Sequence, residues 1–363
     1  MSTSIGQYGN TGASIILSAG IKQMTLEQQT LSWETAGRTL SETYAGLGAS
    51  RSTVIALAPR ITQITAWQGN ISTAQGNLTL TANALTNIVT QAQALSTNLL
   101  SILGTTQAST VTSIATEARN ALTQLGNTLN TSNGTGYIFA GQEASEPPIP
   151  GGASSLATSS LSTQIASLVS SMGTGTLSAS DVMEQATTAA NPTSSFSVFS
   201  SALSTTPVAA GALASTVITG NGTSSIMGIV ATQSSTSSAA SATSTGSPIM
   251  DLMRDMMVVS SMSGLSSTSP GYTDLVTQLN TSLKTTVSQL VEMESTVGTA
   301  QDGLTSNASL LTNVQTMLKT QVTNIQGADI AQVATETSAL STNLEASYQL
   351  IAKMKSMTLA SYI

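Results

Sequence analysis

Two long heptad repeats, one in each half of the chain, limit what the chain can fold into more than any other feature. The first repeat steps by three and four residues from Val54 to Leu103, and twelve of its fifteen positions are apolar. The second repeat runs in the same way from Val276 to Ile325 and is equally apolar. At about 1.5 Å per residue, each repeat predicts a helical rod of roughly 75 Å. The apolar seam of such a rod requires a partner helix that covers it.

We predict that the two repeats are partners and form an antiparallel coiled coil. The first rod helix is expected to begin near Pro59, because proline is tolerated in a first helical turn. The apolar seam residues are Ile61, Ile64, Ile71, Leu78 and Leu85 in the first repeat, and Leu283, Leu290, Leu304, Leu311 and Leu318 in the second. Four polar seam residues are expected either to fix the register or to be partly exposed, namely Gln68, Gln75, Asn307 and Gln321. A hairpin closed within one chain would also account for both repeats, and contacts with other copies would then fall on the termini.

Further helices are predicted on both sides of the rods. Residues 15–40 are compatible with a helix, although their apolar pattern is less regular. Residues 111–129 carry apolar side chains on one helical face and precede Asn133-Gly134-Thr135-Gly136, a typical helix stop. A last helix is expected to begin after Asp329, which suits an N-cap. Its apolar side chains, the candidate assembly residues, are Ile330, Val333, Leu340, Leu344, Tyr348, Ile351 and Met354.

The middle of the chain differs in composition from both flanks. No basic residue occurs from Glu143 to Met250, where Ser, Thr, Gly and Ala dominate. A small mixed domain is predicted from β-like runs at 196–199, 216–219 and 226–230, a turn at 220–222, and helix-compatible segments at 161–172 and 180–190. Ser247-Pro248 is then expected to start a helix. In that helix, Asp251 and Asp255 with Arg254 are expected to form a solvated first turn rather than a functional site.

These patterns together predict a mainly α fold. Its long antiparallel coiled coil, or helical bundle, is built from the amino- and carboxyl-terminal segments, and a small mixed α/β domain is inserted between them. The predicted parts are a terminal polymerisation helix at 1–50, rod helices at 51–142, an inserted surface domain at 143–247, rod helices at 248–327, and a second polymerisation helix at 328–363.

The composition excludes several classes of function. The chain has no cysteine and no histidine, so it lacks thiolate chemistry and the commonest general base and metal ligand. The net charge of −7 and an aromatic content of 3% argue against binding to nucleic acid or anionic membranes. We therefore predict no catalytic, metal-binding or cofactor-binding residue. An enzyme within the insert is the weakest alternative, because only Glu143, Glu146, Asp181 and Glu184 are ionisable there.

The carboxyl terminus resembles a known family. The segments Ala328–Glu336, Leu344–Gln349 and Leu359–Ile363 resemble the terminal signature of the bacterial flagellin superfamily. Gly136–Gly141 resembles the point where the hook-associated (hook–filament junction) members pass from their last amino-terminal helix into the insert. Ser247–Asp255 resembles the family's return from that insert into the carboxyl-terminal helices. Residues 34–44 depart from the Ser-Gly-Leu-Arg-Ile and Asp-Asp-Ala pattern of typical flagellins, and the Tyr362-Ile363 ending also suits the junction type.

This resemblance implies a structural subunit of the bacterial flagellum that self-assembles through its terminal helices. It implies an extracellular location, reached by type III export without a cleaved signal peptide. The implied partners are other copies, homologous axial proteins of the hook, junction and filament, and an export chaperone, with no cofactor, nucleic acid or membrane. The alternatives are a flagellin that forms the main filament and, less in keeping with the terminal signature, a secreted coiled-coil adhesin.

Overall fold

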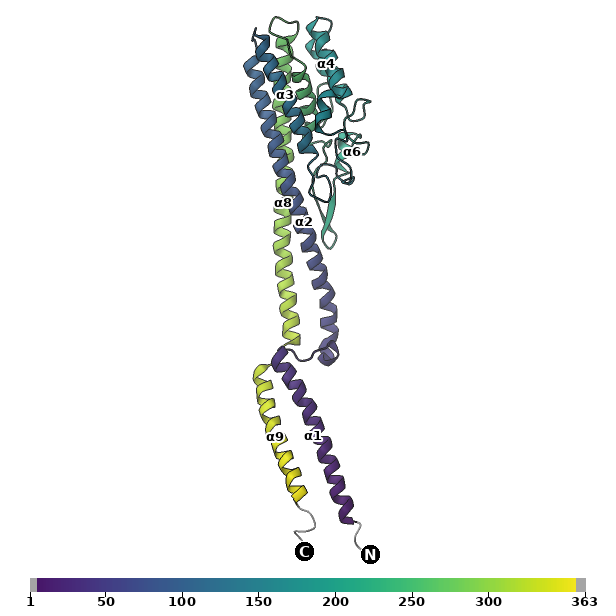
Figure 1. Ribbon diagram of the computed structural model, residues 1–363, viewed down its shortest axis with the longest axis vertical. Coiled ribbons are helices and arrows are strands. Elements are labelled where there is room, and N and C mark those ends of the chain that lie inside the picture. The colour runs from purple at the N-terminus through teal and green to yellow at the C-terminus, as the bar shows by residue number, and fades with distance from the viewer. Residues whose placement is uncertain (1–4, 357–363) are drawn as a thin grey trace. The chain divides into compact units, whose positions relative to one another are not determined.

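The computed structural model of the protein describes residues 5–356 and is mainly helical (Figure 1). The predicted mainly α class with a small inserted α/β region is confirmed. The chain forms two compact units. Unit 1 combines Met1–Thr65 with Leu311–Ile363, and unit 2 consists of Ala66–Leu310. The five-part division predicted from the sequence is a different description of the chain and stays a prediction.

Unit 1 is built around two helices from opposite ends of the chain. Helix α1 (Ile5–Gly37) packs against α9 (Ile330–Ser356). The Asp329 carboxylate accepts hydrogen bonds from the backbone N–H groups of Ala331 and Gln332, at 2.9 and 3.3 Å, which confirms the predicted N-cap. Just before α9, the backbone of residues 326–328 is hydrogen-bonded to that of residues 38–40.

Helix α2 (Arg51–Ile102) follows the 3-10 helix η1 (Tyr44–Ser50) and begins earlier than predicted. Pro59 lies inside α2 rather than in its first turn. A proline there removes one helical hydrogen bond, which leaves the carbonyl of residue 55 without its usual partner. Pro59 and Ile55 are both exposed, so solvent can hydrate that carbonyl. The helix therefore continues through a residue that would stop it in a buried environment.

Unit 2 contains the paired parts of α2 and α8 (Tyr272–Gln326), which run antiparallel. Hydrogen bonds between their side chains join Gln75 to Thr305 at 3.1 Å and Gln301 to Thr79 at 3.2 Å. Helix α3 (Ala108–Leu129) packs on α7 (Pro248–Ser260) and on the 3-10 helix η2 (Ala153–Thr158). The apolar face predicted for α3 is buried, although the helix ends at Leu129, before the predicted stop.

The inserted region has the two predicted helices, as α4 (Ser160–Gly173) and α5 (Ala179–Ala190), and a short helix α6 (Pro207–Gly211). The predicted turn joins β1 (Thr216–Gly220) to β2 (Thr223–Ile226) in an antiparallel hairpin. Gly222 in this turn has a φ of 77°, which favours glycine.

Two of the predicted β-like runs are wrong in whole or in part. Residues 196–199 form no strand, because hydroxyls of neighbouring serines bind the backbone locally. The Ser194 hydroxyl accepts from the Phe196 N–H at 3.2 Å, and the Ser197 hydroxyl accepts from the Phe199 N–H at 3.4 Å. Of residues 226–230, only Ile226 belongs to a strand, whereas Ile229 and Val230 are buried in irregular backbone.

The prediction of a solvated first turn in α7 is wrong. Every residue of α7 is buried, including Asp251, Arg254 and Asp255. The two carboxylates pair with the Arg254 guanidinium, at 3.3 Å for Asp251 and 2.8 Å for Asp255. Local sequence shows charges at a helix start, which are usually solvated. It does not show that α3, α4 and α5 pack on this helix.

Candidate assembly surface

The candidate assembly residues of α9 divide into two groups. Val333, Leu340 and Leu344 are buried and form a small core with Leu31 of α1. Ile330 and Tyr348 are exposed, at 43% and 55%. Ile351 is half-buried, and the Met354 side chain lies outside the described residues. The α9 face predicted to contact other copies is therefore partly occupied by α1 of the same chain.

Helix α1 carries two apolar stripes on opposite sides. Ile21, Met24 and Leu31 contribute to the core that α1 shares with α9. A second set, Ile15, Leu26 and Trp33, is exposed, at 62%, 51% and 40%. At about 100° per residue, these three side chains lie within roughly 20° of one another and opposite Met24 and Leu31. We define Ile15, Leu26 and Trp33 as the outer stripe.

Sequence reasoning missed the outer stripe. The available signal was the irregular apolar pattern of residues 15–40, which two opposite stripes produce when they are superimposed on one helix. Each stripe taken alone is regular. The outer stripe is interrupted by the exposed Lys22 between Ile15 and Leu26 and is not covered by α9, and exposed large apolar side chains of this kind are candidates for an interaction site.

Acidic side chains also meet in unit 1. Burial, together with the nearby Glu336 carboxylate of α9, raises the pKa of Glu34 in α1. This repulsion between like charges opposes the pairing of α1 with α9. The pairing is therefore held by few apolar contacts and weakened by one electrostatic contact, so further contacts outside the hairpin would stabilise it.

The rod seam residues are mostly buried. Those with relative exposure below a tenth are Ile64, Ile71, Leu78, Leu85, Leu283, Leu290, Leu304 and Leu311. Ile61 and Leu318 are half-buried. Among the polar seam residues, Gln75 donates to Thr305 on the facing helix, whereas Gln321 is exposed. Asn307 donates instead to the Thr219 carbonyl of the β-hairpin at 3.1 Å.

Comparison with known proteins agrees with this geometry. Residues 280–363, which include most of α8 and all of α9, match the family model of the bacterial flagellin C-terminal helical region. The carboxyl-terminal part of the chain is therefore similar to bacterial flagellins, and this similarity supports a structural subunit of the flagellum. No curated protein matches the chain.

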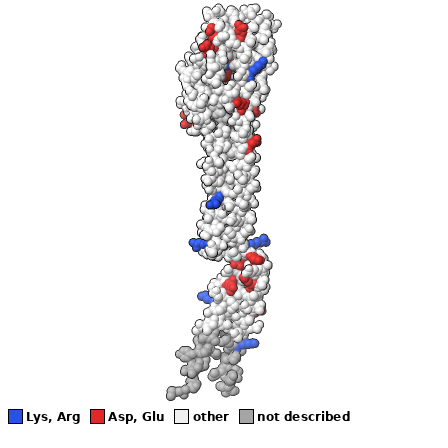
Figure 2. Space-filling model, turned by 180° about the vertical axis from the view of Figure 1, so that it is seen from behind, with Lys and Arg blue, Asp and Glu red and all other residues white. Residues whose placement is uncertain are grey.

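The surface of the protein offers little charge for recognition by electrostatics. Figure 2 shows that uncharged residues make up most of the visible face. Among residues 5–356, no cluster of three or more acidic side chains is placed to hold a metal ion. No helix in the same range is both long and apolar enough to cross a membrane.

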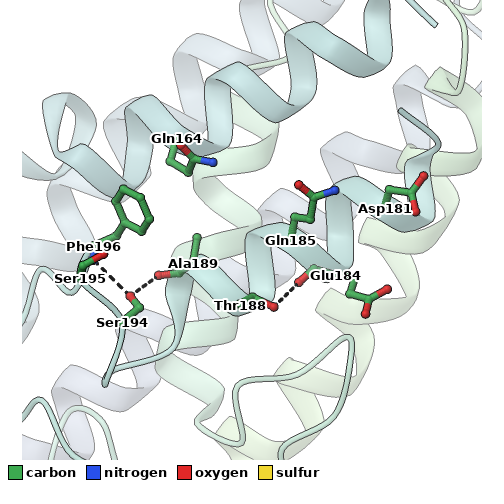
Figure 3. A pocket seen from close by; sticks show the side chains of 9 residues that line it. All are labelled: Gln164, Asp181, Glu184, Gln185, Thr188, Ala189, Ser194, Ser195 and Phe196. Atoms are coloured by element: carbon green, nitrogen blue, oxygen red, sulfur yellow. Dashed lines mark hydrogen bonds between the residues drawn. The ribbon is translucent and has the colours of Figure 1, made fainter. Parts of the chain in front are cut away.

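One open groove in the insert has ionisable side chains. It has a volume of about 700 Å³ and lies beside α4, α5 and residues 194–196 (Figure 3). Figure 3 shows the Phe196 ring near one end and the Asp181 and Glu184 carboxylates near the other. Hydrogen bonds from the Ser178 hydroxyl and backbone N–H lower the pKa of Asp181, because this carboxylate caps α5. The Asp181 carboxylate of the groove thus serves the local fold.

Proposed function

We propose that the protein self-assembles through unit 1, with the outer stripe of α1 covered by another copy of the chain. The exposure of Ile15, Leu26 and Trp33 carries this proposal. Burying a side chain of this size contributes roughly 1.5–3 kcal/mol. Three such side chains per contact, repeated along a filament, supply the stabilisation that the small core of unit 1 lacks.

The contact is expected to be head-to-tail. In such a contact, the outer stripe of α1 would face a different surface of the next copy, namely the exposed apolar residues Ile330, Tyr348 and Leu350 of α9. A contact between two different surfaces does not close on itself as a two-fold dimer does. Repeated by a fixed rotation and rise, it produces a ring or a helical tube.

Among flagellar subunits, we propose the hook–filament junction type. The support is the resemblance of residues 136–141 and 247–255 to the borders of the insert in that type, and the departure of residues 34–44 from the typical flagellin pattern. The main filament flagellin is the second candidate, because the matched region is shared by both. Homologous axial proteins would then be the neighbours in the flagellum.

The exposed apolar residues of α9 also indicate a partner during export. Before assembly, the apolar residues of α9, with Ile330 and Tyr348 already exposed, would be covered by an export chaperone. We propose export through the flagellar type III route. The predicted assembly residues Val333, Leu340, Leu344 and Ile351 would act indirectly by holding α9 on α1.

The assembly proposal is tested by replacing two residues of the outer stripe. The double variant L26Q/W33Q should remain folded, because both side chains are exposed in the single chain. It should raise the protein concentration needed for polymerisation roughly tenfold or more, because two apolar side chains no longer become buried. Polymerisation followed by light scattering, with helix content from circular dichroism, measures both effects.

The matched control is Ile218→Gln, which changes an exposed apolar residue of the β-hairpin in unit 2. The control should polymerise like the natural protein. Normal polymerisation of L26Q/W33Q would show that the outer stripe is not the contact between copies. Equal impairment of the control would show a general loss of solubility or folding instead.

A further inference from the structure

A buried cluster of three charged side chains lies at the centre of unit 2. Arg254 is completely buried, Asp255 is equally inaccessible, and Asp251 is 3% exposed. The Arg254 Nε and Nη2 atoms both donate to Asp255 Oδ1, at 3.0 and 2.8 Å, and Nη1 donates to Asp251 Oδ1 at 3.3 Å. We call these three residues the Arg254 cluster.

The Arg254 cluster connects four segments of the chain. Arg254 Nη1 donates to the Thr187 hydroxyl of α5 and to the Thr243 carbonyl, both at 2.8 Å. Its Nη2 donates to the Ser282 hydroxyl of α8 at 2.7 Å. The guanidinium of α7 therefore joins the inserted region, through α5 and residue 243, directly to the long helix α8.

Both carboxylates add to this connection. The Ser282 hydroxyl donates to Asp255 Oδ2 at 2.7 Å, so Asp255 is bound to α8 as well as to Arg254. Asp251 accepts from the Ser244 hydroxyl at 2.6 Å and from the Thr245 N–H at 2.7 Å. The segment 243–245 is thus held by Asp251, and α8 is held by Asp255.

The charges of the cluster do not balance. Two carboxylates share one guanidinium, so the buried group carries one net negative charge when both carboxylates are ionised. The charged groups that act on Asp255 are Arg254 and Asp251, both from α7, while α8 contributes only the Ser282 hydroxyl. Burial raises the pKa of Asp255 to about 6, although Arg254 and the hydrogen bond from Ser282 oppose this shift.

A cavity of about 450 Å³ lies beside the cluster and is lined by Thr243, Ser244, Asp251 and Ser282, among other residues. Asp251 therefore borders the cavity, whereas Asp255 is completely buried and is bound to Ser282. A proton bound to Asp255 Oδ2 would be donated to Ser282 Oγ, which replaces the present donation from the Ser282 hydroxyl to Oδ2, so the serine hydrogen would turn to another acceptor. The Arg254 contacts to Asp255 Oδ1 would remain.

We infer that the Arg254 cluster is a proton-sensitive joint, which attaches α5 and segment 243–247 to α8 more firmly when it has bound one proton. The geometry of the cluster gives it this property, since a single proton cancels the unbalanced buried charge and reverses, rather than removes, the hydrogen bond between Asp255 and Ser282. The proposal is independent of the proposed assembly function.

The direction of the effect follows from proton linkage. The ordinary pKa of an aspartate is 3.8, and that of Asp255 in the folded protein is about 6. A raised pKa means that the folded state binds the proton more tightly. The stabilisation is therefore complete below the ordinary value, decreases as the pH rises, and is lost above about 6. Between pH 7.5 and pH 5, the local opening of the joint should decrease roughly tenfold.

Hydrogen exchange measures this local opening. Backbone amides of α5 and of segment 243–247, including the Thr245 N–H, should exchange about tenfold more slowly at pH 5 than at pH 7.5, after correction for the intrinsic effect of pH. In the full-length variant Asp255→Asn this pH dependence should disappear, since the amide cannot ionise but can still accept from Arg254 and donate to Ser282. The matched control Asp302→Asn, an exposed site on α8, should keep it.

Three results would overturn the inference. The first two are an unchanged exchange rate and a faster exchange rate of the natural protein at the lower pH. The third is a full pH dependence in the Asp255→Asn variant, which would assign the effect to another group. If Asp255→Asn does not fold, Asp251→Asn gives a second test, because it removes the same unbalanced charge and should also flatten the pH dependence.

Discussion

Gly126 of α3 and Gly76 of α2 are both glycines inside helices, but their surroundings differ. A Cβ atom at Gly126 would lie 2.8 Å from Ala153 Cα and 2.8 Å from Leu156 Cδ1, both in η2. A Cβ atom at Gly76 would meet no atom within 4 Å. The absence of a side chain at Gly126 is thus a packing requirement. At Gly76 it only lowers helix stability.

We expect opposite effects from the same substitution at these two sites. Gly126→Ala should destabilise the protein by about 1–3 kcal/mol, because η2 must move away from α3. Gly76→Ala should stabilise it by about 0.5–1 kcal/mol, because alanine favours the helix. Urea unfolding of both variants measures the free energy of unfolding. Changes of the same sign in the free energy of unfolding of the two variants would contradict this description of the contact between α3 and η2.

The residues that could be predicted from the sequence are those whose role is local. Asp329 was predicted as an N-cap because a cap depends only on the next three residues. The Arg254 cluster could not be predicted, because its partners Thr187, Thr243 and Ser282 come from three other segments. The exposed stripe of α1 was missed for the same reason, since which stripe α9 covers is decided by tertiary packing.

At the scale of elements, the antiparallel register of α2 and α8 is marked by polar side chains beside the seam. Thr79 pairs with Gln301, and the Thr86 hydroxyl donates to Glu294 at 2.6 Å. One heptad along α2 is matched by one heptad back along α8, from residue 301 to residue 294. These are the flanking positions that usually carry salt bridges in coiled coils. In this protein, hydrogen bonds among threonine hydroxyls, the Gln301 amide and the Glu294 carboxylate take the place of those salt bridges.

The loss of the hydrogen bond between Gln301 and Thr79 should have a small but measurable effect on stability. Thr79→Val keeps the shape of the side chain and removes the acceptor for Gln301, so the free energy of unfolding should fall by about 1 kcal/mol. Because the pair is uncharged, the effect should be the same at low and high salt. Thr73→Val is the matched control, since the Thr73 hydroxyl is exposed and binds only the Gly69 carbonyl of its own helix. A loss no greater than that of the control would rule out a register role.

The heptads of the rods could be predicted because long periodic patterns persist whatever their surroundings. The β-like run at 196–199 failed because Ser194 and Ser197 offer the backbone local hydrogen bonds that compete with a strand. Helix α2 extends beyond its expected start because exposure of Pro59 makes its missing hydrogen bond tolerable. The apolar pattern of the sequence shows neither the exposure of Pro59 nor the local hydrogen bonds of Ser194 and Ser197 that compete with a strand.

At the scale of the whole molecule, the proposed junction role has a simple spatial consequence. Antibodies raised against the insert, residues 143–247, should label intact flagella at one point near the base of each filament. The control is an antibody against the main filament protein, which should label the full length. Insert label along the whole filament would contradict the junction role and would identify the chain as the main filament subunit, leaving the contact through the outer stripe unaffected.

The short backbone ladder near the base of α9 has a mechanical consequence. Leu40 N–H donates to the Gln326 carbonyl at 2.7 Å, and Ala328 N–H donates to the Arg38 carbonyl at 3.1 Å. These bonds fasten two connecting strands to each other at one level of the chain. A force that pulls on one of these two segments is therefore partly carried by the other.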